Sequence, residues 1–208
     1  KYAAEAVQAD MAQLLSVIDS THPDPALSFD SAELRRLSQQ LTGEISGAMT
    51  AREAWLVLAR LNPHFRDAHT GLRHPVAEYE AHLAAGGAAF PAAVFVDRSG
   101  MLRASAQATP ESGLAPYEEI VAINGRPTDA VVAALMQRMR GETDSIRRLV
   151  LSYSFPAHLW TLLGPQAAFC ADIVDRNGNR RRGLLEGTKK AGGTAGPAPG
   201  RSLATFVQ

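Results

Sequence analysis

The most constraining feature of this sequence is a run of turn and apolar residues in its second half, residues 112–127, which read SGLAPYEEIVAINGRP. Gly113 can adopt a positive φ without a Cβ clash, and Pro116 fixes φ for a turn. Residues 120–123 are apolar and partly β-branched, which is typical of a short buried strand. The Asn-Gly pair that follows predicts a second tight turn. This order predicts a β-containing unit built around the run.

Composition narrows the class of protein. The chain has 208 residues, of which 46% are hydrophobic and 20% charged, as is ordinary for a folded domain. Lys and Arg number 21 and so do Asp and Glu, so no basic footprint for nucleic acid is present. No apolar run approaches the roughly 20 residues of a membrane-spanning helix, so no transmembrane segment is predicted. Cys170 is the only cysteine, which excludes an intrachain disulfide.

The first third of the chain predicts three amphipathic helices. Asp30 and Thr50 each precede an apolar stripe and are followed three residues later by a Glu, which is the pattern of a capping box. Because the connections are short, we expect the helices to pack as a three-helix bundle, with strands only after Ala88. The three stripes consist of Val7, Met11, Leu14, Leu15 and Ile18; of Leu34, Leu37, Leu41 and Ile45; and of Trp55, Leu58 and Leu61.

The rest of the chain mixes strands and helices, so the predicted fold class is α+β. Residues 1–85 are expected to form the helical domain and residues 86–186 a β domain with a helical insert. That insert is predicted as two further helices between residues 146 and 163, and a hairpin closes the domain. From residue 187 to 201 the composition shifts to Gly, Pro, Ala, Thr and Lys, and residues 202–208 are apolar again. Residues 187–208 are therefore predicted to be a flexible linker and the start of a further domain.

A loop after the third helix, with the sequence HFRDAHTGL from His64 to Leu72, is rich in groups that can do chemistry. His69 is a candidate general base, because a serine hydroxyl needs a base within hydrogen-bond reach to become nucleophilic at neutral pH. The alternative is that His69 and Thr70 only cap the loop by hydrogen bonding to its backbone. The histidines near this loop do not share one helix face at metal-ligand spacing, so neither a metal nor a cofactor is predicted.

Taken together, the motifs resemble the N-terminal part of the carboxyl-terminal processing and tricorn-like serine peptidases. Members show Asp-Gly-His-Thr or a close variant where this chain has Asp67, Ala68, His69 and Thr70. Their PDZ-like domains carry the run G-L-x-P-G-D-x-I-x-x-I-N-G-x-P. The positions of this chain that match it are Gly113, Leu114, Pro116, Ile120, Ile123, Asn124, Gly125 and Pro127. Tyr117 and Glu118 replace the usual Gly and Asp, so a less tight turn is expected there.

The resemblance implies a helical domain, a PDZ-like domain and then an α/β domain that carries the serine nucleophile. No segment of this chain resembles that last domain, so the chain alone is predicted to be inactive. In tricorn-like members a His at the position of His69 is the general base, whereas Ser–Lys members use a lysine of the α/β domain. The resemblance further implies a polypeptide, or its C-terminus, as partner and an exported parent protein.

A second candidate site is the Gly86-Gly87 loop before Phe90. PDZ-like domains hold a peptide carboxylate with backbone N–H groups and pair the peptide to an exposed strand edge. We therefore expect Gly86 and Gly87 to form the carboxylate cradle and the Phe90 strand to offer the edge. The alternative is an ordinary connector. For the whole chain, the alternative to a peptidase portion is a non-catalytic peptide-binding or scaffold module.

Overall fold

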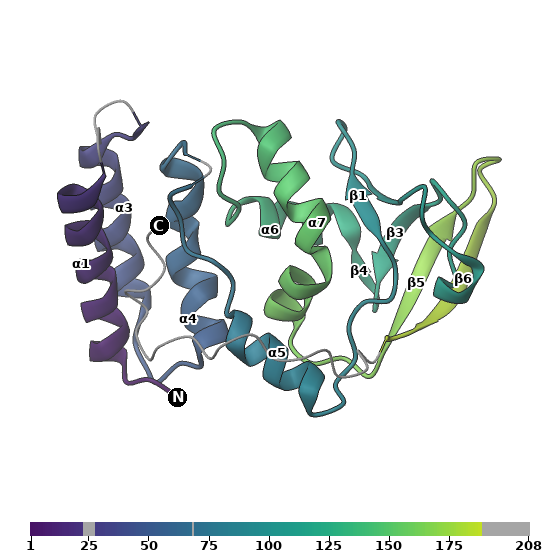
Figure 1. Cartoon of the computed structure of the whole chain (residues 1–208), viewed down its shortest axis with the longest axis horizontal. Helices are drawn as coiled ribbons and strands as arrows, with labels where there is room; N and C mark the ends of the chain where they lie inside the picture. The colour runs from purple at the N-terminus through teal and green to yellow at the C-terminus, as the bar shows by residue number, and fades with distance from the viewer. Residues whose placement is uncertain (23–27, 68, 189–208) are drawn as a thin grey trace.

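The computed structural model describes residues 1–22, 28–67 and 69–188, and it joins helices to one antiparallel sheet (Figure 1). The α+β prediction is confirmed. The helices are α1 (Ala4–Thr21), α3 (Ser31–Glu44), α4 (Ala51–Leu58), α5 (Val76–Ala84), α6 (Thr128–Met136) and α7 (Asp144–Leu163), with 3₁₀ turns η1 (Ala59–His64) and η2 (Pro110–Ser112). The strands are β1 (Val94–Val96), β2 (Leu102–Ala104), β3 (Glu119–Ile123), β4 (Arg126–Pro127), β5 (Ala168–Val174) and β6 (Arg180–Glu186). The linker predicted from residue 187 lies outside the described residues except for its first two positions.

The predicted caps position the second and third helices. Asp30 begins α3 by accepting hydrogen bonds from the backbone N–H groups of Ala32 and Glu33, at 2.8 and 3.0 Å. Thr50 begins α4 with a full capping box, because its hydroxyl accepts from Glu53 N and the Glu53 carboxylate accepts from Thr50 N. Glu33 differs from Glu53, since its carboxylate lies 3.2 Å from His64 Nδ1. The capping box is therefore formed at Thr50, whereas at Asp30 the Glu33 carboxylate contacts His64 instead.

Two apolar clusters form the interior. The first gathers buried residues of α1, α3, α4 and η1 with two flanking phenylalanines, and consists of Val7, Met11, Ile18, Phe29, Leu34, Leu41, Ile45, Ala54, Leu58, Leu61 and Phe65. The second lies between the sheet and the helices α6 and α7, and it also takes in Trp55 and Ala59 from the helical part. In Figure 1, α7 accordingly lies between α4 and the sheet. None of the described helices is long and apolar enough to span a membrane.

The sheet has the order β1-β2-β3-β5-β6, with β4 paired to β3. Alternation of buried and less buried residues along β5 directs one face towards α6 and α7. Every named strand lies after Ala88, as predicted; before it, the described residues hold one isolated bridge, between Tyr2 and Met49. The two helices predicted between residues 146 and 163 are both present, as the two halves of α7, which meet at a kink at Ser154 because Pro156 cannot continue the hydrogen-bond ladder.

The run that dominates the sequence forms two tight turns around β3. Asn124 and Gly125 have φ values of 49° and 75°, and the Asn124 side chain also accepts a hydrogen bond from Cys170 N on β5, at 2.8 Å. In the first turn, Tyr117 has a φ of 68° and Glu118 N donates to Ala115 O. The expectation of a less tight turn is therefore wrong. Tyr117 accepts the left-handed conformation that Gly would take without cost, and the turn closes normally.

Glu118 reinforces this first turn from inside. Its carboxylate is largely buried, accepts a hydrogen bond from Ala115 N at 2.8 Å and pairs with Arg181 Nη2 at 2.6 Å. The carboxylate therefore joins the turn to the last strand of the sheet, β6. A buried carboxylate is stable only with such partners, because it has lost its hydration.

Gly113, just before the first turn, can be compared with Gly178, between β5 and β6, to test how closely the backbone at Gly113 is packed. Both have positive φ, 76° and 86°, but a Cβ at Gly113 would lie 2.7 Å from Leu185 Cδ2, whereas a Cβ at Gly178 would meet nothing within 4 Å. We expect Gly178→Ala to lower the free energy of unfolding by about 1 kcal/mol, the cost of the left-handed conformation. Gly113→Ala should cost about 1 to 2 kcal/mol more, because Leu185 is buried in the core. Urea unfolding of both variants measures the difference, and equal costs would contradict the close approach.

Candidate functional site

The loop between η1 and α5 is organised around the Asp67 carboxylate. Its Oδ1 accepts a hydrogen bond from His69 N at 2.8 Å, and its Oδ2 accepts one from the Thr70 hydroxyl at 2.6 Å. The His69 ring lies beside the same carboxylate, with Nδ1 3.3 Å from Oδ1. His22, which follows α1, places Nε2 3.6 Å from Oδ2. Asp67 therefore gathers backbone and side-chain groups of the predicted motif into one turn.

These contacts keep Asp67 ionised. Partial burial by itself would raise the pKa of this carboxyl, but the hydrogen bonds from Thr70 and from the backbone and side chain of His69 outweigh burial and lower the pKa to about 2. A carboxylate at neutral pH can only accept hydrogen bonds. The His69 nitrogen that faces it, Nδ1, must therefore carry the proton.

The His69 ring therefore contacts Asp67 through Nδ1 only. Its side chain is 89% exposed, and within the described part of the chain no group bonds Nε2. A neutral imidazole that donates through Nδ1 has its lone pair on Nε2, which is the form that accepts a proton from a nucleophile. An exposed imidazole of this form, with a carboxylate beside Nδ1, can chemically accept a proton at Nε2.

The other histidines are dispersed. His64 pairs with Glu33, and the His82 ring lies against Trp160 with centroids 5.6 Å apart. His74 packs against His158, with ring centroids 4.8 Å apart. In the described residues no three His, Cys, Asp or Glu side chains are grouped so that they could hold a metal ion.

Asn62 is a buried polar residue that was not predicted from the sequence. Asn62 is 1% exposed, and its side-chain amide bonds the backbone of Leu72 and of Arg138. The signal available in the sequence was an Asn next to Pro63, which is also typical of a surface turn. The contact with Arg138 spans 76 positions of the chain and is not encoded locally.

The structure contradicts the geometry predicted for the Gly86-Gly87 loop. Gly86 N donates to Leu83 O and Gly87 N donates to His82 O, so both N–H groups close the C-terminus of α5. Phe90 is 3% exposed and packs edge-on against Phe155 and Phe169 in the core. The two glycines therefore form no open carboxylate cradle, and Phe90 offers no exposed strand edge.

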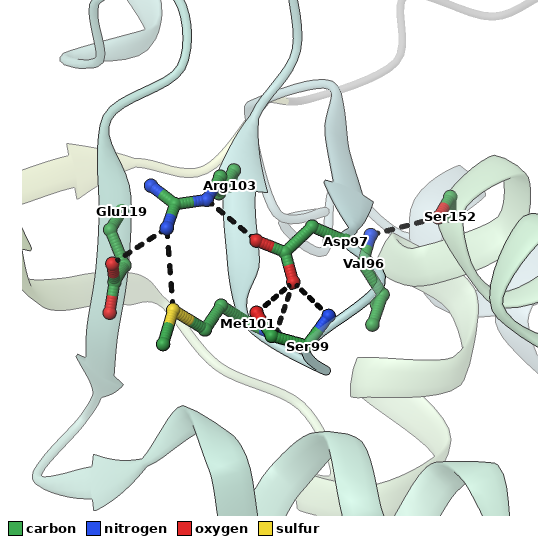
Figure 2. A network of polar contacts seen from close by, with 7 residues as sticks. All are labelled: Val96, Asp97, Ser99, Met101, Arg103, Glu119 and Ser152. Atoms are coloured by element: carbon green, nitrogen blue, oxygen red, sulfur yellow. Dashed lines mark hydrogen bonds and ion pairs between the residues drawn. The ribbon is translucent and has the colours of Figure 1, made fainter.

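The strand edges near this loop are also occupied by the chain itself. Ala89 forms a two-bond antiparallel bridge with Thr188. Further along, Val96 of β1 donates its N–H to the hydroxyl of Ser152 on α7, at 3.0 Å (Figure 2). Because β1 is the first strand of the sheet, α7 covers the edge at which an added peptide strand would pair.

The hairpin that carries β1 is fixed by a polar network on the side away from α7 (Figure 2). Asp97 accepts hydrogen bonds from Ser99 N, Ser99 Oγ and Met101 N, which closes the turn between β1 and β2. Arg103 connects this turn to β3, because it bonds Asp97 through Nε at 2.8 Å and Glu119 through Nη2 at 3.1 Å. The network joins β1, β2 and β3 to one another. The Val96 N–H, next to Asp97, bonds Ser152 instead.

Comparison with known proteins identifies the fold. No protein-family model matches the sequence, and no curated protein matches it. Among solved structures, mature CPAF complexed with lactacystin is similar at 15% identity and a TM-score of 0.59. A structure of mature CPAF alone is similar at 14% identity and a TM-score of 0.52. Each similarity covers 88% of this chain and 34% of the other chain. This chain therefore spans about a third of the length of CPAF, which is a chlamydial serine protease. The fold is therefore related to that of a protease.

Proposed function

We propose that this chain is the part of a serine peptidase that supplies the general base, His69, to a serine carried on another domain. The observation that carries the proposal is the Asp67–His69 pair, in which the carboxylate lies 3.3 Å from Nδ1 and the His69 side chain is 89% exposed. The fold shared with CPAF supports the same class of protein. The non-catalytic alternative, a scaffold module, does not need an exposed imidazole with a carboxylate behind it.

In this mechanism His69 Nε2 takes the proton of the serine hydroxyl as the serine oxygen attacks the carbonyl carbon of the peptide bond. The Asp67 carboxylate keeps Nδ1 protonated and stabilises the imidazolium that forms. The proton then passes from Nε2 to the leaving amine, and a water molecule repeats the sequence to release the acyl group. Thr70 takes no proton; its hydroxyl holds the second oxygen of Asp67 in place.

The proposal extends to the domain plan. Residues 1–85 would form the helical bundle domain and residues 86–186 the PDZ-like domain with its helical insert, in a parent that is exported and acts on polypeptides. The order of the two motifs, around His69 and around Asn124, supports this plan. Peptide capture by Gly86, Gly87 and Phe90 is not part of the proposal, because their N–H groups and side chain are used internally.

The proposal is tested by comparing this chain with the full-length protein. The purified chain should not hydrolyse casein or unstructured peptides, because a base without a positioned nucleophile gives only background rates. The full-length protein should hydrolyse them and react with a fluorophosphonate probe at a serine outside residues 1–208. Turnover that remains with this chain through repurification would place the nucleophile within it. A full-length protein that neither hydrolyses peptides nor reacts with the probe would favour the scaffold alternative.

A further inference from the structure

The side-chain amide of Asn62 forms three hydrogen bonds at the end of the candidate loop. Oδ1 accepts a hydrogen bond from Leu72 N at 2.7 Å, and Nδ2 donates to Leu72 O at 2.9 Å. The second hydrogen of Nδ2 goes to Arg138 O at 2.8 Å. The amide therefore pairs with Leu72 as a neighbouring strand would, and at the same time reaches the segment that follows α6.

Neighbouring groups tighten this junction. Trp55 Nε1 also donates to Leu72 O, at 3.3 Å, so the one carbonyl accepts from two side chains of the helical part. Gly71 lies so close that a Cβ on it would be 3.0 Å from Asn62 Oδ1 and 3.1 Å from Arg140 Cβ. The backbone directly after Thr70 is thus held between η1 on one side and residues 138–140 on the other.

The opposite end of the loop is anchored in a different way. Phe65 is fully buried in the first apolar cluster, so the loop begins at a residue of the core. The loop ends at Leu72, whose backbone is bonded to Asn62. Between these anchors lie Asp67 and His69, whose mutual contacts are local. These local contacts shape the loop, and His22 Nε2, 3.6 Å from Asp67 Oδ2, links its first half to the end of α1. Its second half is linked to the rest of the fold at Leu72.

We infer that Asn62 is a positioning residue for His69, because it fixes the second end of the His69 loop against both the helical part and the sheet part of the fold. The inference rests on the proposed function. Displacement of a catalytic group by about 1 Å can cost on the order of 10²-fold in rate. Because Asn62 holds Leu72, three residues after His69, its loss is expected to lower turnover. Asn62 does not touch the reacting atoms; it acts through Leu72 and the loop backbone.

The test uses Asn62→Asp in the full-length protein. The two side chains have the same shape, but the carboxylate replaces the Nδ2 donor with an oxygen that faces Leu72 O and Arg138 O. We expect hydrogen exchange of peptides covering residues 69–75 to become at least about 10-fold faster. We expect kcat and the rate of fluorophosphonate labelling to fall about 10- to 100-fold, with KM changed less than about threefold.

Two further variants keep the test decisive. Thr128→Val removes another buried hydrogen bond, from the Thr128 hydroxyl to Ile120 O, at the start of α6 and so at the end of that helix opposite Arg138. It should destabilise the fold without changing exchange at residues 69–75 or kcat. Trp55→Phe removes the longer hydrogen bond to Leu72 O, together with part of a buried ring that packs against His158. It should loosen the same peptides to a smaller extent even if Asn62→Asp fails to fold. All variants are compared at a temperature where thermal melting shows them to be folded.

The outcomes separate this inference from the proposed function. If His69→Ala abolishes turnover while Asn62→Asp leaves both exchange and kcat unchanged, Asn62 has no positioning role and the proposed function stands. If Asn62→Asp loosens residues 69–75 but His69→Ala keeps full turnover, the proposed function fails and the positioning role fails with it. Faster exchange together with a lower kcat and unchanged KM supports both.

Discussion

Replacing His69 with Ala in the full-length protein is expected to lower turnover by on the order of 10⁴- to 10⁶-fold, the loss typical of removing a member of a catalytic triad. The reason is that a serine hydroxyl without a base stays protonated at neutral pH. The substitution should leave the fold intact, because the side chain is almost fully exposed and its packing contributes little. Rates of peptide hydrolysis and thermal melting of the same preparation measure the two effects separately.

His64→Ala is the matched control. His64 belongs to the same sequence motif, but its ring pairs with Glu33 of α3 and takes no part in the Asp67 cluster. Its loss should be near neutral for turnover. If His69→Ala keeps more than about a tenth of the wild-type rate, the loss of transition-state stabilisation is below about 1.4 kcal/mol. The base would then lie elsewhere, with a lysine of the nucleophile domain as the leading candidate.

Stability is expected to fall steeply with acid between about pH 6.5 and 4.5, because two neutral histidines, the buried His158 and the half-buried His74, pack against each other. Burial lowers the pKa of His74 to about 3, with the neighbouring charges of His158 and Arg73 acting in the same direction. Burial likewise lowers the pKa of His158 to about 4, although its hydrogen bond to Ser154 O opposes the shift and Arg140 adds to it. The two rings are in contact, so the structure cannot easily hold both charged.

The direction of this pH dependence follows from the number of protons that the folded and unfolded states bind. Below pH 6.5 the unfolded chain protonates both histidines, whereas the folded protein does not until the pH approaches 4 and then 3. The unfolded state therefore binds more protons in this window, and the free energy of unfolding rises with pH there and levels off above 6.5. Each histidine contributes a slope of about 1.4 kcal/mol per pH unit, or on the order of 2 to 3 kcal/mol by pH 4.5.

Urea unfolding at several pH values from 7.5 to 4.5 measures this slope. His74→Gln and His158→Gln should each reduce it by about half, since Gln does not titrate. Ile120→Val, a core substitution that costs about 1 kcal/mol, should shift the whole profile without changing its slope. Asp67 and Asp97, whose pKa values are about 2, lose their contribution mainly at more acidic pH and so do not mask the result. A wild-type profile that is flat from pH 6.5 to 4.5 would contradict the buried neutral pair.

What the sequence predicted well is what is local in the chain. The caps at Asp30 and Thr50 follow from bonds between residues at most three apart, and so they could be read directly. The α+β class followed in the same way, from helical periodicity in the first third and strand patterns after Ala88. The Asp67 turn, with its bonds to His69 and Thr70, is local as well, although its catalytic role stays a proposal.

What the sequence could not provide is contact between distant segments. A Gly-Gly pair before an aromatic strand fits a binding loop, but Phe90 is buried by Phe155 and Phe169, which lie 65 and 79 positions further along the chain. The anchor made by Asn62 depends on Arg138 in the same way. Tyr117 shows the opposite error: its replacement of Gly suggested a loose turn, because the buried support from Glu118 and Arg181 was not visible in the sequence.

The cover that α7 places over β1 has a consequence for the behaviour of the protein at high concentration. An uncovered edge strand is a template on which a second molecule can extend the sheet, and such growth leads to aggregation. On the β1 side the Ser152 hydroxyl already accepts the hydrogen bond that a foreign strand would take from Val96. The opposite edge, β6, carries charged side chains instead, since it begins with Arg180, Arg181 and Arg182, of which Arg181 pairs with Glu118 and Arg182 with Asp172. The two ends of the sheet thus differ in what a second molecule would meet: a helix at β1 and charged side chains at β6.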